Sequence, residues 1–269
     1  MSVDLNAEGL EFYSRFLESY DTTYLSEVRK YVKDRGMCIP MMCYSPDFTT
    51  KDKLRRDKEI LEQREIIKVT SLLGGSFCRV LSGQRRDDVG IKEGVGYVVD
   101  SIKACLETAE KYNVCLVMEN HYKDGFWKYP EFAQKKDVFL SIINKIDSDY
   151  FGVQYDPSNA VVAGDDPIEL LEIVKDRVKT VHASDRYIKD GYKLDDLKHA
   201  EGATGYSDIL CHGVTGKGLN DYDNIFRILK EVGFDGWVSI EDGMNGMDEM
   251  KQSVDFLKKM RKKYWPDNK

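Results

Sequence analysis

Short apolar runs, rich in β-branched and aromatic residues, alternate along this chain with longer segments in which apolar residues recur every three or four positions. The short runs predict seven strands, at residues 9–13, 38–45, 77–83, 114–121, 151–158, 180–184 and 236–242. Helical spacing of apolar residues is clearest at 98–109, 139–146, 170–174, 225–232 and 250–260. This alternation is typical of repeated βα units that build a parallel sheet.

The predicted architecture is a TIM-type (β/α) barrel that forms one domain over residues 1–269, since such barrels routinely reach about 250 residues. A closed barrel has eight strands, so the first βα unit is missing before Leu10. Either the chain is truncated, or the polar N-terminal segment or a partner covers a gap. We favour truncation, because an open sheet edge would leave backbone groups unpaired.

The longest stretch without a clear element runs from 186 to 219 and contains six glycines. Loops longer than about 15 residues are usually functional or disordered. Because this stretch follows the predicted strand that carries His182, we expect a long rim loop at the C-terminal mouth of the barrel, where active sites occur.

Composition and charge narrow the function classes. With 42% hydrophobic and 32% charged residues, the chain has the composition of an ordinary globular protein. A net charge of -7 provides no basic face for a phosphate backbone, so nucleic acid is not an expected partner. Six cysteines without CxxC spacing predict reduced core residues. No signal peptide and no apolar run of about 20 residues is visible, and the expected location is cytoplasmic.

Acidic or imidazole side chains stand at the same end of the last four predicted strands. They are Glu119, Asp156, His182 and Glu241. Because parallel strands bring such ends to one rim, these four side chains should meet. A mixed oxygen and nitrogen shell suits Mn²⁺, Mg²⁺, Co²⁺ or Zn²⁺, and three carboxylates without a cation would raise one another's pKa at a cost. The sequence therefore predicts one divalent metal ion here.

Each of these residues also has an ordinary interpretation. A single glutamate at a strand end is more often a solvated loop residue, and a lone histidine is more often a satisfied structural one. Four in series favour the metal site.

The motifs VMENH, YDPSN, VHASD and GWVSIED resemble the sugar isomerase and epimerase superfamily, the xylose isomerase-like TIM barrels. The resemblance covers nearly the whole chain from Gly9, and the family's first strand has no counterpart here. It implies that Glu119, Asp156, His182 and Glu241 ligate one divalent ion, with Mn²⁺ the first choice.

The predicted function is a metal-dependent sugar isomerase or epimerase that removes a proton next to the carbonyl of a keto sugar. A metal ion that polarises the carbonyl contributes several kcal/mol to such a step. Carboxylates on the two sides of the substrate then remove and return the proton, and we assign this pair to Glu119 and Glu241.

The chain departs from the family in one place. Many epimerase-like members carry a histidine three residues after the aspartate, where this chain has Asn159, which hydrogen bonds but is no base. His121 shares a strand face with Glu119 and is either catalytic in its place or an orienting residue. Asn159, Asp185 and Arg186 are the predicted substrate-binding residues, although Arg186 fits a plain salt bridge equally well.

Three aromatic residues, Phe126, Trp127 and Tyr129, follow the strand that ends in Glu119. Sugars often stack on such rings, but aromatic residues also cap barrel loops, and we favour the second interpretation.

Three other functions compete with an isomerase. Apurinic endonucleases of the same superfamily bind several zinc ions with many histidines. This chain has only four, which argues against that function. The resemblance also includes lyase subunits that eliminate an aglycone from 3-oxo-C-glycosides and need a partner subunit. Both a partner subunit and a homo-oligomer are therefore compatible with this sequence. A metal-binding protein without turnover is the third.

Overall fold

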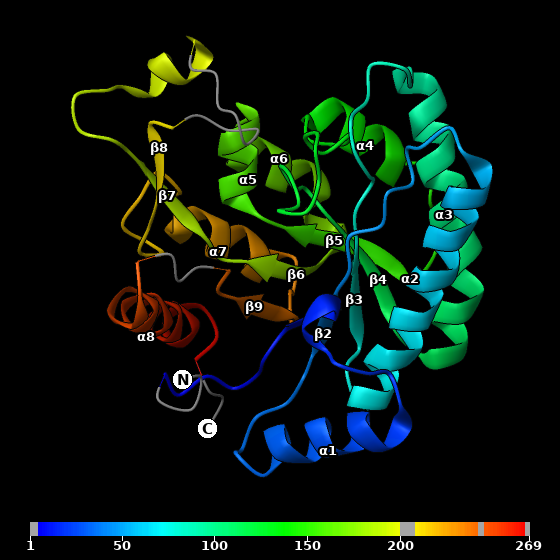
Figure 1. Cartoon of the computed structure of the whole chain (residues 1–269). Coiled ribbons are helices and arrows are strands. Elements are labelled where there is room, and N and C mark those ends of the chain that lie inside the picture. Colours follow the sequence, from blue (N-terminus) through cyan, green and yellow to red (C-terminus); the bar gives the residue numbers. More distant parts are fainter. Residues whose placement is uncertain (1–4, 200–207, 242–244, 267–269) are drawn as a thin grey trace. The chain divides into compact units, whose positions relative to one another are not determined.

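The computed structural model describes residues 5–199, 208–241 and 245–266. Its chain divides into two compact units, which are described separately (Figure 1). The N-terminal unit comprises the described residues within 2–119 and 123–152. The C-terminal unit comprises residues 120–122 and the described residues within 153–269. Asp242 and residues 200–207, which belong to a predicted strand and to the predicted rim loop, lie outside the described residues.

The N-terminal unit is a parallel βα structure. Its strands run in the order β1-β2-β3-β4, namely β1 (Phe12–Tyr13), β2 (Met41–Cys43), β3 (Phe77–Val80) and β4 (Cys115–Glu119). Its helices are α1 (Thr22–Lys33), α2 (Lys53–Leu73), α3 (Ile91–Tyr112) and α4 (Lys136–Ile143), with a short 3₁₀ helix at Ser14–Phe16. The long helices α2 and α3 pack side by side (Figure 1).

Capping residues set the helix boundaries in this unit. Asp21 and Asp52 precede α1 and α2, and each side chain accepts hydrogen bonds from two backbone N–H groups of the first turn. Gly74 ends α2, and Asn113 ends α3, both in the left-handed conformation that closes a helix. Both long helices, α2 and α3, therefore end shortly before the strand that follows them.

The C-terminal unit contains a second parallel set and an antiparallel hairpin. The parallel strands run in the order β5-β6-β9, namely β5 (Phe151–Tyr155), β6 (Val178–His182) and β9 (Trp237–Ser239). The first two residues of β5 belong to the N-terminal unit. The hairpin pairs β7 (Asp185–Ile188) with β8 (Leu210–Gly213). The helices are α5 (Pro157–Ala163), α6 (Pro167–Val174), α7 (Tyr222–Glu231) and α8 (Met247–Tyr264), with 3₁₀ helices at Lys175–Arg177 and Leu194–His199.

Each of the seven predicted strands overlaps a strand with parallel pairing among the described residues. The stretch from 186 to 219 differs from the expected loop, because β8 and nearly all of β7 lie within it. Sequence patterning missed this hairpin, since each strand has only four residues and β7 begins Asp-Arg. The single-domain assignment over 1–269 stays a prediction.

All six cysteines are described, and all are free thiols. Burial confirms the core assignment for Cys43, Cys78 and Cys105, and it raises the pKa of Cys105 to about 12. The core assignment is wrong for Cys38, which is exposed. Cys115 and Cys211 are of intermediate exposure. A low-pKa reactive thiol is not expected at the buried positions.

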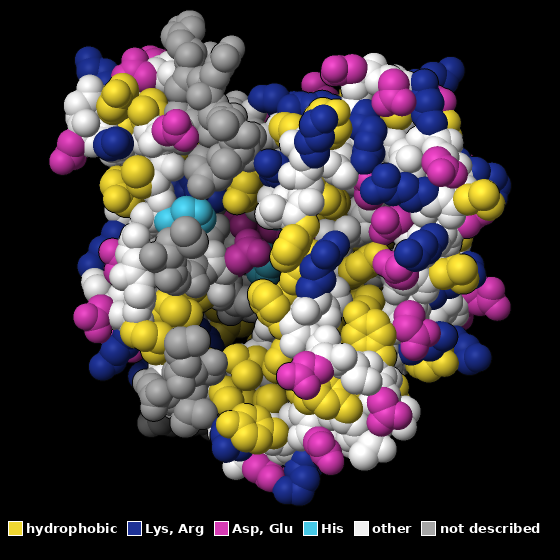
Figure 2. All heavy atoms as spheres, viewed as in Figure 1, with side chains coloured by type: hydrophobic (Ala, Val, Ile, Leu, Met, Phe, Trp, Pro, Cys, Tyr) yellow, Lys and Arg dark blue, Asp and Glu magenta, His cyan; other side chains and the backbone are white. Residues whose placement is uncertain are grey.

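The face in Figure 2 mixes basic and acidic side chains over α2 and α3. Pairs one helical turn apart, such as Lys53 with Asp57 and Lys58 with Glu62, account for part of this pattern. Within the described residues, no helix has the length and apolar character needed to cross a membrane. The cytoplasmic location stays a prediction.

Candidate metal centre

Asp156 directly follows β5 and is the N-cap of α5. Its carboxylate accepts a hydrogen bond from the backbone N–H of Asn159 at 2.9 Å, and Pro157 occupies the first helical position. Aspartate followed by proline is a favoured start for a helix, because the cap uses the carboxylate and proline has no N–H to leave unpaired. The motif YDPSN therefore fixes this carboxylate against the first turn of α5.

Two further side chains of the C-terminal unit hold Asp156. The side chain of Asn120 donates to the Asp156 carbonyl at 2.6 Å and accepts from its N–H at 2.8 Å. The Ser184 hydroxyl lies 3.1 and 3.2 Å from the two carboxylate oxygens. Such outer hydrogen bonds are what fixes a ligating carboxylate in metal sites.

His182 and Glu241 meet Asp156 in the same unit. His182 is the buried last residue of β6, and its Nδ1 lies 3.3 Å from Oε2 of Glu241, whose side chain is 46% exposed. Asp156, His182 and Glu241 each offer a ligand atom, and these atoms lie within 4.8 Å of one another. The structure therefore brings together the three predicted ligands that belong to the C-terminal unit.

This donor set fits a divalent cation. It combines two carboxylates with one imidazole, the mixture that borderline metals such as Mn²⁺, Co²⁺ and Zn²⁺ accept. Asp156 and His182 are almost fully buried, and their proximity to a second carboxylate is most easily balanced by a positive ion.

Glu119 ends β4 in the N-terminal unit, where it is buried and paired with an arginine that the sequence analysis missed. Arg79 Nη1 donates to Glu119 Oε2 at 2.8 Å, and Arg79 Nη2 donates to the Ser45 hydroxyl at 3.1 Å. Both members of the ion pair are at most 5% exposed. The role of Glu119 as a ligand stays a prediction.

His121 belongs to a row of stacked and hydrogen-bonded rings in the C-terminal unit. It is buried and stacks on Tyr122 at 5.2 Å between centroids. The guanidinium of Arg186 lies 5.6 Å from the centre of the Tyr122 ring, and its Nη1 is 3.1 Å from His212 Nε2. Arg186 is thus buried beside a histidine and an aromatic ring.

Asp185 organises the loop after β8. Its carboxylate accepts hydrogen bonds from the backbone N–H groups of Gly216, Gly218 and Asn220 at 2.9–3.2 Å, and from that of Arg186 at 2.9 Å. Burial raises the pKa of this carboxyl, and the hydrogen bonds oppose that rise. Because both oxygens are used in these bonds, we assign Asp185 a role in holding the loop.

Asn120 and Ser184 were not singled out from the sequence. The sequence could have indicated Asn120, because it directly follows Glu119 at the end of a strand. A side-chain amide in that place can hydrogen bond to the backbone at the end of the next strand. Ser184 lies two residues after His182, and nothing in its residue type distinguishes it from any loop serine.

The buried hydroxyl of Thr180 in β6 has no hydrogen-bond partner among the described residues. Thr180→Val is therefore expected to change the free energy of unfolding by less than about 0.5 kcal/mol. Thr215, equally buried, donates to the carbonyl of Ala183 at 2.9 Å, and Thr215→Val should cost about 1–3 kcal/mol. Urea unfolding of both variants tests this, and equal costs would contradict it.

Parallel βα units with acid and imidazole side chains at their strand ends define the class, which is that of TIM-type α/β barrels. More specifically, the chain belongs to the xylose isomerase-like TIM barrel family, whose profile matches residues 2–260. This confirms the predicted family and fold class.

Individual relatives differ in their named activities. The inosose dehydratase of Clostridium beijerinckii is 24% identical over 229 residues, which are 80% of this chain and 72% of that protein. A D-tagatose 3-epimerase-like protein has a similar structure, with a TM-score of 0.75, 17% identity and coverage of 96% of this chain and 89% of its own. The IOLI protein, whose structure contains a zinc atom, gives a TM-score of 0.72 with 17% identity, covering 98% and 92% of the two chains. The two structures support the fold.

Proposed function

We propose that this protein is a divalent-metal-dependent enzyme that removes a proton next to the carbonyl of a keto sugar. Glu119, Asp156, His182 and Glu241 would hold one ion, with Mn²⁺ the first choice. The zinc in IOLI supports a divalent ion on this fold and favours no particular metal for this chain.

One observation carries the proposal: the grouping of Asp156, His182 and Glu241, with the Asp156 carboxylate held by Ser184 and the first turn of α5. Glu119 is included because it is the residue before Asn120 in the sequence. The side chain of Asn120 forms two hydrogen bonds with the backbone of Asp156, at 2.6 and 2.8 Å.

The residues of the chain divide the chemistry between them. A bound divalent ion would supply Lewis-acid stabilisation of the negative charge that develops on the carbonyl oxygen. Glu241 is suited to accept the proton from carbon, because its half-exposed side chain can exchange that proton with solvent. Glu119, whose carboxylate Arg79 holds in place, is the second member of the proposed proton-transfer pair.

The fate of the deprotonated sugar decides the reaction class. Return of the proton gives an isomerase or epimerase, which is the function we propose first. Loss of a neighbouring group gives a lyase, and the relationship to an inosose dehydratase favours that second candidate. Both begin with the same proton abstraction.

Deuterium exchange tests the shared step. Keto sugars, keto inositols and 3-oxo-glycosides are incubated with manganese-loaded protein in D₂O and followed by proton NMR. The expected result is loss of the signal of the proton next to the carbonyl for at least one compound. Exchange with recovery of a sugar isomer indicates an isomerase, and release of water or an aglycone indicates a lyase. No exchange with any compound would contradict the proposal.

A further inference from the structure

Four polar side chains of the N-terminal unit lie along the carboxyl ends of its parallel strands. Tyr13 ends β1, Ser45 follows β2, Arg79 lies in β3 and Glu119 ends β4. Ser45, Arg79 and Glu119 are at most 8% exposed. Because a buried charge is costly without fixed partners, the contacts of Arg79 determine how the Glu119 carboxylate is held.

The guanidinium of Arg79 divides its donors between two acceptors. Nη1 donates to Glu119 Oε2 at 2.8 Å, whereas Nη2 donates to the Ser45 hydroxyl at 3.1 Å. An arginine beside a carboxylate frequently forms two parallel bonds instead, with a separate nitrogen on each carboxylate oxygen. Ser45 therefore engages the nitrogen that would complete such a bidentate pair with Glu119.

A tyrosine ring adjoins the same guanidinium. The guanidinium carbon of Arg79 lies 6.0 Å from the centre of the Tyr13 ring, at the outer edge of the range for a cation–π contact. The Tyr13 hydroxyl donates to Asp124 Oδ2 at 3.0 Å, and Asp124 Oδ1 accepts from the backbone N–H of Phe126 at 2.8 Å. The ring is thus fixed in place, and the bond to Ser45 sets the direction of the guanidinium beside it.

The direction of this guanidinium affects what else Glu119 can bind. A bidentate arginine occupies both oxygens of a carboxylate, and its positive charge lies close to each of them. A divalent ion that uses the same carboxylate would then compete for its oxygens and be repelled by the arginine. With Nη2 directed to Ser45, this competition is weaker.

We propose that Ser45 is a positioning residue that keeps Arg79 from forming a bidentate pair with Glu119 and thereby keeps Glu119 available to the divalent ion. Ser45 acts through Arg79 and needs no contact with the substrate or the ion. The inference rests on the proposed function for the role of Glu119 as a ligand, but the change in arginine pairing on loss of Ser45 needs no metal.

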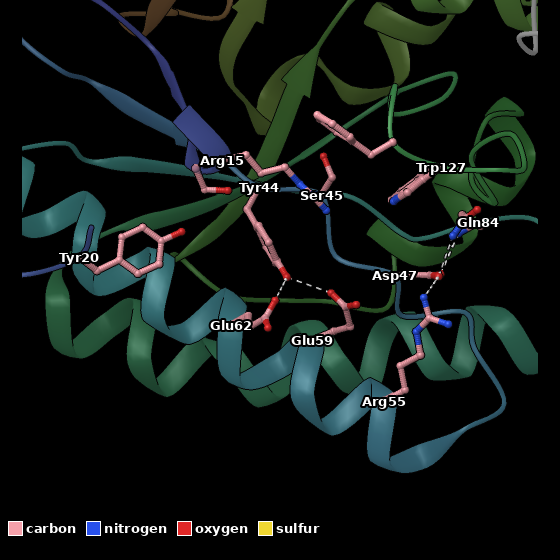
Figure 3. Close-up of a pocket in the computed structure, with 12 residues that line it drawn as sticks. Arg15, Tyr20, Tyr44, Ser45, Asp47, Arg55, Glu59, Glu62, Gln84 and Trp127 are labelled. Carbon is pink, nitrogen blue, oxygen red and sulfur yellow. Dashed lines mark hydrogen bonds and ion pairs between the residues drawn. The ribbon is translucent and has the colours of Figure 1, made fainter. Parts of the chain in front are cut away.

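A cavity of about 390 Å³ within the N-terminal unit adjoins Ser45 and makes a conservative variant feasible (Figure 3). Ser45→Thr keeps the hydroxyl, and its added methyl group has room because the cavity is far larger than a methyl group. Ser14 is another buried serine that lines this cavity. Ser14→Ala is therefore the matched control for Ser45→Ala.

Mn²⁺ binding, measured by isothermal titration calorimetry, tests the role of Ser45. Ser45→Ala is expected to weaken binding about tenfold, the lower end of the effect of losing an outer hydrogen-bond partner of a metal site. Ser45→Thr and Ser14→Ala should bind Mn²⁺ as the unaltered protein does. The urea midpoint of metal-free Ser45→Ala should stay close to that of the unaltered protein, because Nη2 exchanges one acceptor for another. A purely structural serine would instead lower the midpoint and leave Mn²⁺ binding unchanged.

A crystal structure of metal-free Ser45→Ala tests the pairing by itself. We expect Nη1 and Nη2 of Arg79 both to donate to Glu119. A guanidinium that stays in its present position, unchanged Mn²⁺ binding by Ser45→Ala, or an equal loss of binding in Ser14→Ala would overturn the inference. Absence of Mn²⁺ binding by the unaltered protein would count against the proposed function, and the crystal structure of the variant would then decide the inference separately.

Discussion

Glu241→Gln is expected to lower the rate of proton exchange in the keto sugar by about 10²- to 10⁴-fold or more, since it removes a side chain that is both the proposed proton acceptor and a proposed metal ligand. Glutamine keeps the shape of the side chain but cannot take up a proton. The fold should tolerate the change, because the side chain is 46% exposed. The measurement is the NMR exchange rate under saturating metal, together with the urea midpoint.

The matched control is Glu249→Gln in α8, a glutamate of intermediate exposure with a hydrogen bond to a neighbouring side chain, that of Asn245. It should leave the exchange rate within about twofold of the unaltered protein. An exchange rate that is the same in both variants would remove Glu241 from the chemistry.

Arg79→Met is expected to destabilise the protein by about 3–5 kcal/mol, because it leaves the carboxylate of Glu119 buried without the guanidinium that now lies 2.8 Å away. The loss exceeds that for an exposed pair, since water cannot reach either group to replace the partner. Urea unfolding at neutral pH measures it.

A double variant separates the charge effect from packing. Arg79→Met combined with Glu119→Met removes both charges and should recover much of the lost stability, because an apolar pair of similar volume replaces a buried ion pair at little cost. Lys53→Met in the exposed pair with Asp57 provides the surface control and should cost less than about 1 kcal/mol. Equal losses in Arg79→Met and the double variant would show that packing dominates.

The site residues that could be predicted from the sequence are those at the ends of predicted strands. His182 closes β6, and the carboxylates of Asp156 and Glu241 follow β5 and β9. Parallel pairing of these strands brings such ends to one edge. The seven strands followed in the same way, because their apolar runs are interrupted by polar segments of helical period.

Long-range pairings between polar side chains did not follow from the sequence. Arg79 is an arginine within an apolar strand, and its partner lies 40 positions away, so no local pattern indicates the ion pair. The bond between Asn120 and Asp156 likewise joins residues 36 positions apart.

The role of the loop at 126–129 also depended on distant residues. An interpretation of these aromatic residues as caps was favoured from the sequence, whereas the structure places Phe126 and Trp127 on a polar cavity. The segment is held by Gln84, which comes from the preceding βα unit. Residue types alone carry no information on such a contact.

Metal content tests the central claim most directly. The protein is purified without chelator, loaded with Mn²⁺, freed of excess metal and analysed by elemental mass spectrometry, beside His182→Ala and Glu241→Gln. We predict about one Mn²⁺, Co²⁺, Zn²⁺ or Mg²⁺ ion per chain in the unaltered protein and loss of that ion in both variants. An unaltered protein that retains no metal after loading, or variants that retain it fully, would contradict a metal centre built on Asp156, His182 and Glu241.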